Sequence, residues 1–251
     1  MTTRRRALLL AGTALAGVSA CGATSAGTTG TPATSDMPQP QQPAPAQAAQ
    51  PWPPEITHGP RTRSAVALTF HGQGDPALVS ALLGVLERAG ARATILAVGS
   101  WLAAEPQLAR RITGAGHDLG NHTQNHRAMT RLSVAAVDRE IDECAQVLHR
   151  LTGTIGTWFR PSQTPRANAV IEAAATRAGY PTCLAYDVDP LDYTDPGAAA
   201  IISTTMRLLR PGSIVSMHCG HVGTVKAMPA LLTAIADRGL RLVSMTELLS
   251  P

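Results

Sequence analysis

The regular alternation of short apolar runs with longer amphipathic stretches after residue 61 is the feature that most constrains how this chain can fold. The runs AVALTF at 65–70 and IVSM at 214–217 have the continuous apolar character of parallel strands that are buried on both faces. The stretch 76–89 instead places Leu78, Leu82, Leu83 and Leu86 on one face of a helix. Repeated units of this kind predict an α/β fold, specifically a distorted or incomplete (β/α) barrel of about seven parallel strands.

The other elements are predicted from the same two periodicities. Further strands are expected at 93–98, in a run that closes at Leu119, at 158–159, at 182–186 and from Leu242 onward. Further helices are expected at 105–113, 133–151, 167–178, 196–209 and 225–238, with a closing helical turn at 245–249.

Polar side chains recur where the predicted strands end. In chain order, these residues are His71, His122, His126, Arg160, Asp187, Asp189, Asp192 and His218. Core packing does not require charged or imidazole groups at the same end of five strands, whereas the active sites of such barrels gather there. The recurrence therefore predicts a functional site that is built from several strand ends.

The segment GHDLGNHTQNH at 116–126 contains two of these histidines, His122 and His126. A spacing of four places both imidazoles on one side if the segment turns helically, which suits a divalent metal such as zinc. The alternative is a pair of surface or turn histidines without a ligand. His117 is expected to satisfy a backbone group rather than to bind metal.

Five segments in the order of the chain, across residues 64–250, resemble the polysaccharide deacetylase family, the NodB-homology domain of carbohydrate esterases. GHDLGNHTQNH resembles its HTxxH motif, and ARATILAVGSWL at 91–102 resembles its second strand. FRP at 159–161 is similar to the motif that supplies an arginine, and YDVDPLDY at 186–193 is similar to DxxDW. GSIVSMHCG at 212–220 resembles the strand that ends in a catalytic histidine.

This resemblance implies a divalent metal, usually zinc, held by two histidines and an aspartate, with a water activated on that metal attacking an acetamide carbonyl. His122 and His126 match the histidine ligands, and His218 matches the acid that protonates the leaving amine. Asp189 and Arg160 are expected to orient His218 and to tune its pKa.

The first motif departs from the family pattern TFDDGP, in which the first aspartate is the base and the second a metal ligand. His71 and Gly72 occupy these two positions. In one interpretation the loop after His71 folds back, so that Asp75 binds the metal and His71 acts as the base. In another, His71 completes a three-histidine zinc site. In a third, Asp75 is only the N-cap of the next helix, with Pro76 at the first helical position.

Other positions also depart from the family. Gln163 stands where the family has the tyrosine of Pro-Tyr-Gly, and its backbone N–H is expected to contribute to an oxyanion hole. Tyr193 replaces the tryptophan of DxxDW, and Cys219 follows His218 in place of an aspartate. The site is therefore predicted with two groups: metal ligands Asp75, His122 and His126, and catalytic residues His71, His218, Asp189 and Arg160.

The first 20 residues predict a bacterial export signal. A basic head at 4–6 precedes an apolar stretch at 7–20 that is too short, and too rich in Gly, Ser and Thr, to serve well as a spanning helix. Val18-Ser19-Ala20-Cys21 resembles a lipobox, so Cys21 is expected to be lipidated and to anchor the protein to the outer face of the cell membrane. Residues 21–60 are rich in Pro and Ala and predict a disordered tether, with the folded domain at 61–251.

Charge and cysteine content limit the partners. The net charge of +4 falls to +1 without the three arginines of residues 1–20, so nucleic-acid binding is not expected. Cys144, Cys183 and Cys219 are expected to be isolated buried thiols, although a Cys183–Cys219 disulfide stays possible. The predicted function is a monomeric, metal-dependent deacetylase of a cell-wall or other extracytoplasmic glycan. The alternative is an inactive relative that binds glycan or metal without hydrolysis.

Overall fold

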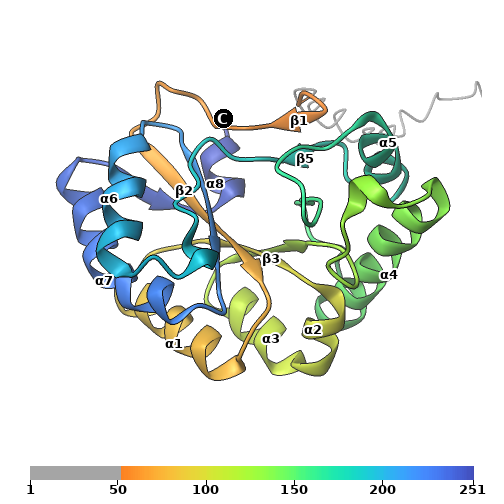
Figure 1. Ribbon diagram of the computed structural model, residues 1–251, viewed down its shortest axis with the longest axis horizontal. Coiled ribbons are helices and arrows are strands. Elements are labelled where there is room, and N and C mark those ends of the chain that lie inside the picture. Colours follow the sequence, from red (N-terminus) through yellow and green to blue (C-terminus); the bar gives the residue numbers. More distant parts are fainter. Residues whose placement is uncertain (1–51) are drawn as a thin grey trace, which may run out of the picture. The chain divides into compact units, whose positions relative to one another are not determined.

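Strand β2 (Ala65–Gly72) is the central strand of the computed structural model, which describes residues 52–251 (Figure 1). It pairs in parallel with β3 (Thr94–Ala97), β6 (Ile214–His218) and β7 (Arg241–Val243), and β4 (Asp118–Asn121) extends the sheet beyond β3. Because these pairs are all parallel, the carboxyl ends of β2, β3, β4 and β6 meet at one edge. The register places His71 directly beside His218.

The rest of the ring is less regular. β1 (Glu55–Ile56) pairs in parallel with β5 (Cys183–Leu184), and single bridges join Asn121 to Phe159, Phe159 to Cys183, and Val188 to Val215. The predicted α/β fold, an incomplete barrel of parallel strands, is therefore confirmed. Seven strands occur within residues 52–251, but they are not the predicted seven: segment 158–159 forms only bridges, and β1 was not predicted.

The two faces of β2 pack in different surroundings. Val66, Leu68 and Phe70 belong to the core between the strands and the helices, whereas Ala65 and Ala67 belong to a separate cluster inside the ring. Because side chains alternate along a strand, Thr69 and His71 lie on the same side as Ala67. The inner side of β2 therefore becomes polar toward its carboxyl end.

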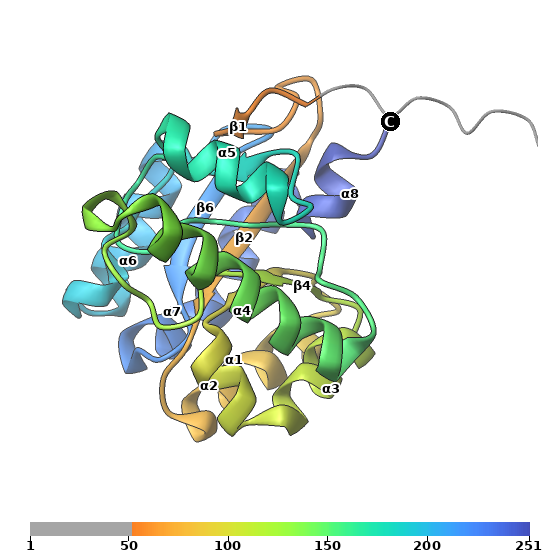
Figure 2. The ribbon, with the colours of Figure 1, turned by 90° about the vertical axis from the view of Figure 1, so that its right-hand side faces the viewer.

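The helices lie around the outside of the strands, as Figures 1 and 2 show. They are α1 (Pro76–Arg88), α2 (Gly99–Ala104), α3 (Pro106–Gly114), α4 (Val134–Thr152), α5 (Ala169–Arg177), α6 (Ala198–Leu208), α7 (Val222–Asp237) and α8 (Met245–Leu249), with short 3₁₀ turns at Met129–Arg131 and Asp192–Thr194. Helix α2 is additional to the prediction. None of the helices in the described residues is both long and apolar enough to cross a membrane.

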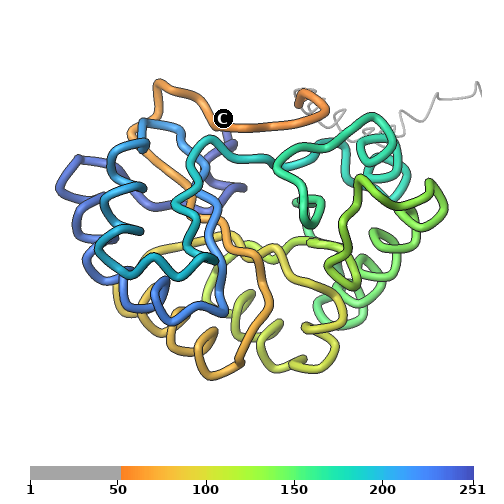
Figure 3. The backbone as a smooth tube through the Cα atoms, in the orientation of Figure 1, coloured from red at the N-terminus to blue at the C-terminus, as the bar shows by residue number. Residues whose placement is uncertain are grey.

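The folded part begins earlier than the predicted boundary at residue 61. Residues 55–56 run beside 183–184 as strand β1 (Figure 3). The Glu55 carboxylate also accepts hydrogen bonds from the Ala167 backbone N–H and from Arg166. The proline-rich composition predicted a tether here. It gave no sign of these contacts, because their partners are more than 100 positions away in the sequence. The predicted export signal, Cys21 and most of the tether lie outside the described residues.

The position of β1 can be tested with Ile56→Ala. The Ile56 side chain is buried, so its truncation should lower the free energy of unfolding by about 2 to 5 kcal/mol, the usual range for such a cavity. Trp52→Ala, at an exposed residue, is the control and should have little effect. Chemical denaturation measures both, and equal stability of Ile56→Ala and the parent would show that β1 is not part of the fold.

Candidate functional site

Three histidines converge at the carboxyl end of the barrel. His71 lies near the end of β2, and His122 and His126 follow β4. One ring nitrogen from each lies within 4.8 Å of the others, a spacing that could hold a metal ion. The ring centroids of His71 and His122 are 4.4 Å apart, and those of His122 and His126 are 5.0 Å apart. The structure thus joins the two histidines of the HTxxH segment to His71.

The HTxxH segment is a loop, not the helical turn that the spacing suggested. Thr123 has φ 70° and His126 has φ 53°, so two non-glycine residues adopt the left-handed conformation. Such residues cost about 1–3 kcal/mol each and persist only where neighbouring contacts hold them. Here Asn121 accepts a hydrogen bond from the Thr123 backbone N–H, and the Thr123 hydroxyl pairs with Ser162.

A buried carboxylate on helix α4 holds the other half of this loop. The two oxygens of Glu140 accept hydrogen bonds from the backbone N–H and the side-chain amide of Asn125, at 2.8 and 3.0 Å. The side chain of Gln163 donates to the carbonyl of His126. Glu140 was missed by the sequence reasoning because it lies within an ordinary amphipathic helix pattern. The available signal was its spacing, because Glu140 lies on the apolar face of the helix with Val137 and Cys144.

His122 presents a lone pair that no group within the described residues uses. Its Nδ1 lies 2.8 Å from the backbone carbonyl oxygen of Arg160, which can only accept, so Nδ1 carries the ring proton. In the neutral ring Nε2 is then an acceptor. This atom is fully buried and has no hydrogen-bond partner within residues 52–251. A buried acceptor without a donor is unfavourable, and a cation in the histidine cluster would satisfy it.

The electrostatic surroundings keep the three imidazoles neutral. Burial lowers the pKa of His71 and of His122 well below the ordinary imidazole value, and neighbouring imidazoles and the Arg160 guanidinium lower it further. Burial also lowers the pKa of His126, with His218 adding to the effect. Neutral imidazoles are the form that binds a metal ion. The residues present therefore fit a divalent cation.

Arg160 lies inside the barrel behind the cluster. Its guanidinium donates to the Thr69 hydroxyl and to the carbonyls of Leu184 and Ala185, and it lies over the Tyr186 ring. Burial lowers its pKa to about 10, so it remains charged at neutral pH. None of the described carboxylates forms a salt bridge with it. Its role at the reaction centre stays a prediction, and its observed contacts connect β2 with β5 and the segment that follows β5.

His218 is oriented by Asp192 and not by the predicted Asp189. The buried Asp192 carboxylate accepts hydrogen bonds from Nδ1 and from the backbone N–H of His218, each at 2.8 Å, and from the Thr224 hydroxyl. Asp189 instead accepts from the backbone N–H of Leu191, within its own loop. The predictive signal was present, because Asp192 is the second aspartate of the DxxDW-like segment. The choice between the two depends on the turn that follows Pro190.

Asp75 is separate from the histidine cluster. Its exposed side chain accepts a hydrogen bond from the Ala77 backbone N–H at 2.8 Å and caps helix α1, with Pro76 at its start. The predicted loop that folds back does not form, because β2 continues through Gly72. A Cβ at Gly72 would lie 3.0 Å from the Cα of Ala97, so β3 packs closely where the family has an aspartate. This arrangement leaves Asp75 outside the group of side chains that could hold a cation and favours the three-histidine alternative, whereas the role of His71 as base stays a prediction.

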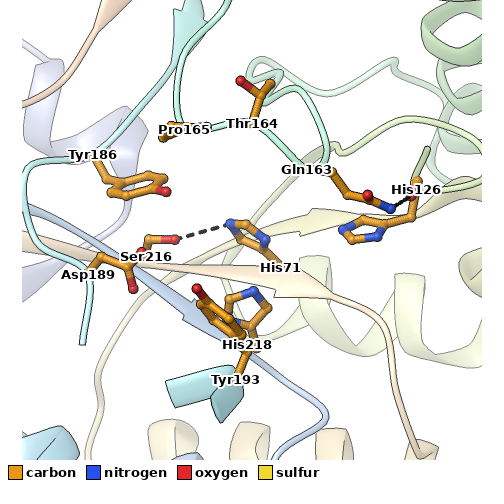
Figure 4. Close-up of a pocket in the computed structure, with 10 residues that line it drawn as sticks. All are labelled: His71, His126, Gln163, Thr164, Pro165, Tyr186, Asp189, Tyr193, Ser216 and His218. Atoms are coloured by element: carbon orange, nitrogen blue, oxygen red, sulfur yellow. Dashed lines mark hydrogen bonds between the residues drawn. The ribbon is translucent and has the colours of Figure 1, made fainter. Parts of the chain in front are cut away.

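An open pocket of about 320 Å³ lies beside the cluster (Figure 4). Its lining residues are His71, His126, Gln163, Thr164, Pro165, Tyr186, Asp189, Tyr193, Ser216 and His218. Asp189 is its one carboxylate among the described residues, and two tyrosines supply aromatic surface. The structure therefore gathers six of the seven predicted site residues at or behind one pocket, and it excludes Asp75.

Two smaller expectations are also resolved. Cys144, Cys183 and Cys219 are buried free thiols, as expected. The His117 ring accepts a hydrogen bond from the Ala93 backbone N–H, which confirms that it satisfies a backbone group.

Known proteins with similar sequence and structure point to one family. The sequence pattern described as polysaccharide deacetylase matches residues 58–183, just over half of the chain. Peptidoglycan-N-acetylglucosamine deacetylase of Bacillus cereus is 29% identical over 194 residues, covering 76% of this chain and 90% of that protein. The uncharacterized protein YlxY of Bacillus subtilis is 27% identical over 197 residues, which are 78% of this chain but only 61% of YlxY.

A solved structure shows the same fold. BA3943 of Bacillus anthracis, described as a pseudoenzyme of the CE4 family, has a TM-score of 0.75 to this structure at 24% identity. The match covers 79% of this chain and 70% of BA3943. At this identity the likeness concerns the fold alone.

Asp75→Ala separates the cap from the ligand interpretation. Loss of the N-cap hydrogen bond should lower the free energy of unfolding by about 1 kcal/mol and leave the bound metal content unchanged. Asp75→Ser keeps a capping oxygen and should restore stability. Denaturation curves and elemental analysis measure the two effects, and metal loss in Asp75→Ala would restore Asp75 to the ligand set.

Protonation should destabilise the metal-free protein. The histidine pKa values are lower in the folded state than the unfolded value of about 6.5, so only the unfolded chain gains these protons as the pH first falls below that value. The free energy of unfolding should be highest above about pH 6.5 and should decrease as the pH falls toward about 5. His122→Gln should make this decrease shallower, whereas an identical slope in the variant would contradict the assignment.

Proposed function

Because the chain belongs to the polysaccharide deacetylase family, we propose that its folded domain is a metal-dependent hydrolase that removes acetyl groups from an acetylated glycan. The observation that carries the proposal is the set of three neutral imidazoles beside an open pocket, with the buried Nε2 lone pair of His122 unsatisfied. Cell-wall peptidoglycan is the candidate substrate, since a relative is named as a deacetylase of its N-acetylglucosamine.

His71, His122 and His126 would hold the cation. Three nitrogen donors suit zinc, whereas magnesium and calcium prefer oxygen ligands. When bound, such a cation supplies Lewis-acid activation of an acyl carbonyl and of water. The ring N–H of His122 donated to the Arg160 carbonyl keeps its other nitrogen directed into the cluster.

His218 is the residue that we assign to protonation of the leaving amine. Its Nδ1 is held by the Asp192 carboxylate, which leaves Nε2 to exchange a proton with a group in the pocket. Asp192 also accepts from the His218 backbone N–H, so it fixes the position of the ring. Tyr186 and Tyr193 offer ring faces on which a sugar could pack, and Tyr193 is 48% exposed at the rim.

A second candidate is a protein that binds glycan or metal without hydrolysis. The absence of a carboxylate at positions 71 and 72 favours it, because the family resemblance assigns the proton-accepting base to the first of these positions. If the protein hydrolyses its substrate, another group must accept that proton, and Asp189 is the carboxylate that lines the pocket. The shared fold with BA3943, a pseudoenzyme, is compatible with this candidate.

The location outside the cytoplasm is part of the proposal and rests on the sequence. The basic head, the apolar stretch and the lipobox-like segment ending at Cys21 support export and lipid anchoring. A cell-wall glycan would be accessible to a domain tethered in this way.

His122→Ala should abolish stoichiometric zinc binding and release of acetate from N-acetylated peptidoglycan fragments. The reason is that the variant removes the buried ring nitrogen, Nε2 of His122, that would bind the cation. Elemental analysis and an enzymatic acetate assay measure the two quantities on the same preparation. His149→Ala, at an exposed histidine on helix α4, is the matched control and should retain both.

The outcomes separate the two candidates. Zinc binding together with acetate release in the parent protein, both lost in His122→Ala, supports the hydrolase. Zinc or glycan binding without acetate release overturns hydrolysis and supports the second candidate. If the parent protein binds no zinc, the metal-dependent proposal is overturned.

A further inference from the structure

Ser216 lies beside His71 in the wall of the pocket (Figure 4). It is a buried residue of strand β6, two positions before His218, and its hydroxyl oxygen lies 3.2 Å from Nε2 of His71. The β2–β6 register places Ser216 opposite Thr69, so the hydroxyl reaches His71 diagonally across the strand pair. The contact therefore joins the central strand to the strand that carries His218.

This contact determines which nitrogen of His71 can bind a cation. If Nε2 donates its proton to the Ser216 hydroxyl, the Nδ1 lone pair is free, and no hydrogen bond to Nδ1 is made by the residues that the structure describes. Nδ1 lies on the side of the ring toward His126 (Figure 4). In the opposite tautomer the ring proton would lie on Nδ1, and His71 would have no lone pair on that side for a cation.

We propose that Ser216 is the positioning residue that makes His71 a third metal ligand. The proposal rests on the metal site of the proposed function and extends it. A carboxylate ligand offers lone pairs whichever way it turns, but an imidazole offers one only in the correct tautomer. A histidine ligand therefore needs an acceptor for its second ring nitrogen. Ser216 supplies it for His71, as the Arg160 carbonyl does for His122.

A competing role for Ser216 is direct contact with the substrate, since its hydroxyl also lines the pocket. The two roles differ in a measurable way. A residue that acts through His71 changes metal affinity only while His71 is present, whereas a substrate contact changes KM and leaves metal affinity unaltered.

The experiment compares the full chain with Ser216→Ala, Ser216→Thr, His71→Ala and the double variant. Zinc affinity is measured by competition with a chromophoric chelator, and the visible spectrum of the cobalt-substituted protein reports the ligand set. Ser216→Ala should weaken zinc binding by about 10-fold or more, as expected for loss of a group that orients a ligand. Ser216→Thr retains a hydroxyl and should restore binding. In the His71→Ala background, Ser216→Ala should cause no further loss.

The control is Ser213→Ala, at a buried residue directly before strand β6. The Ser213 hydroxyl donates to the Asp187 carboxylate and makes no contact with the histidine cluster. It should leave zinc affinity unchanged even if stability falls. Unchanged zinc affinity in Ser216→Ala, or an equal loss with and without His71, overturns the proposal.

A readout in the metal-free protein guards against a variant that folds poorly. The ¹⁵N chemical shifts of the His71 ring should show the proton on Nε2 in the parent, and a shift toward mixed tautomers in Ser216→Ala. A parent ring protonated on Nδ1 overturns the proposal without any reference to zinc. Metal binding with the predicted Ser216 dependence but no acetate release would overturn hydrolysis and leave this inference intact.

Discussion

The rest of the site depends on the buried imidazole of His122, in which one ring nitrogen is held by a hydrogen bond to the Arg160 carbonyl. The Nδ1–H of His122 donates a hydrogen bond to a backbone carbonyl, and the lone pair on Nε2 is buried without a donor among residues 52–251. Burial and the neighbouring cation Arg160 keep this ring and that of His71 unprotonated. The buried lone pair and the clustered neutral imidazoles are unfavourable without a ligand. His126, from the same loop as His122, adds a third imidazole, and together the three rings have the chemistry of a cation site.

The loop that carries two of these imidazoles is unfavourable on its own. Of its left-handed residues, Thr123 pairs with the Ser162 hydroxyl, and the carbonyl of His126 accepts a hydrogen bond from Gln163. Between them, Asn125 donates to the Glu140 carboxylate on α4. The loop therefore keeps its shape only when the surrounding barrel is folded. This dependence joins the stability of the outer helices to the geometry of the cluster.

The exchange of carboxylates for histidine and glycine at positions 71 and 72 changes the charge of the site. The family resemblance implies a ligand set that includes one anionic group, whereas the three imidazoles seen together here are neutral. Arg160 lacks a carboxylate partner among the described residues, and the nearby acids are Asp189 on the pocket wall and Asp192 behind His218. A bound cation would thus meet fewer negative charges, which places more weight on the hydrogen bonds that orient its ligands.

The sequence by itself determined the parallel α/β architecture, the family resemblance and six of the residues that meet at the pocket, because strand and helix periods and the polar residues at strand ends are local properties. It could not decide between the three interpretations of His71 and Asp75, or between Asp189 and Asp192 as the partner of His218. It also placed β1 within the tether. These outcomes depend on contacts between segments far apart in the chain: the pairing of β1 with β5, the close packing of β3 on Gly72, and the turn that directs Asp192 inward. Hydrogen bonds and packing across the barrel select among conformations that are locally equivalent, and only the tertiary structure contains them.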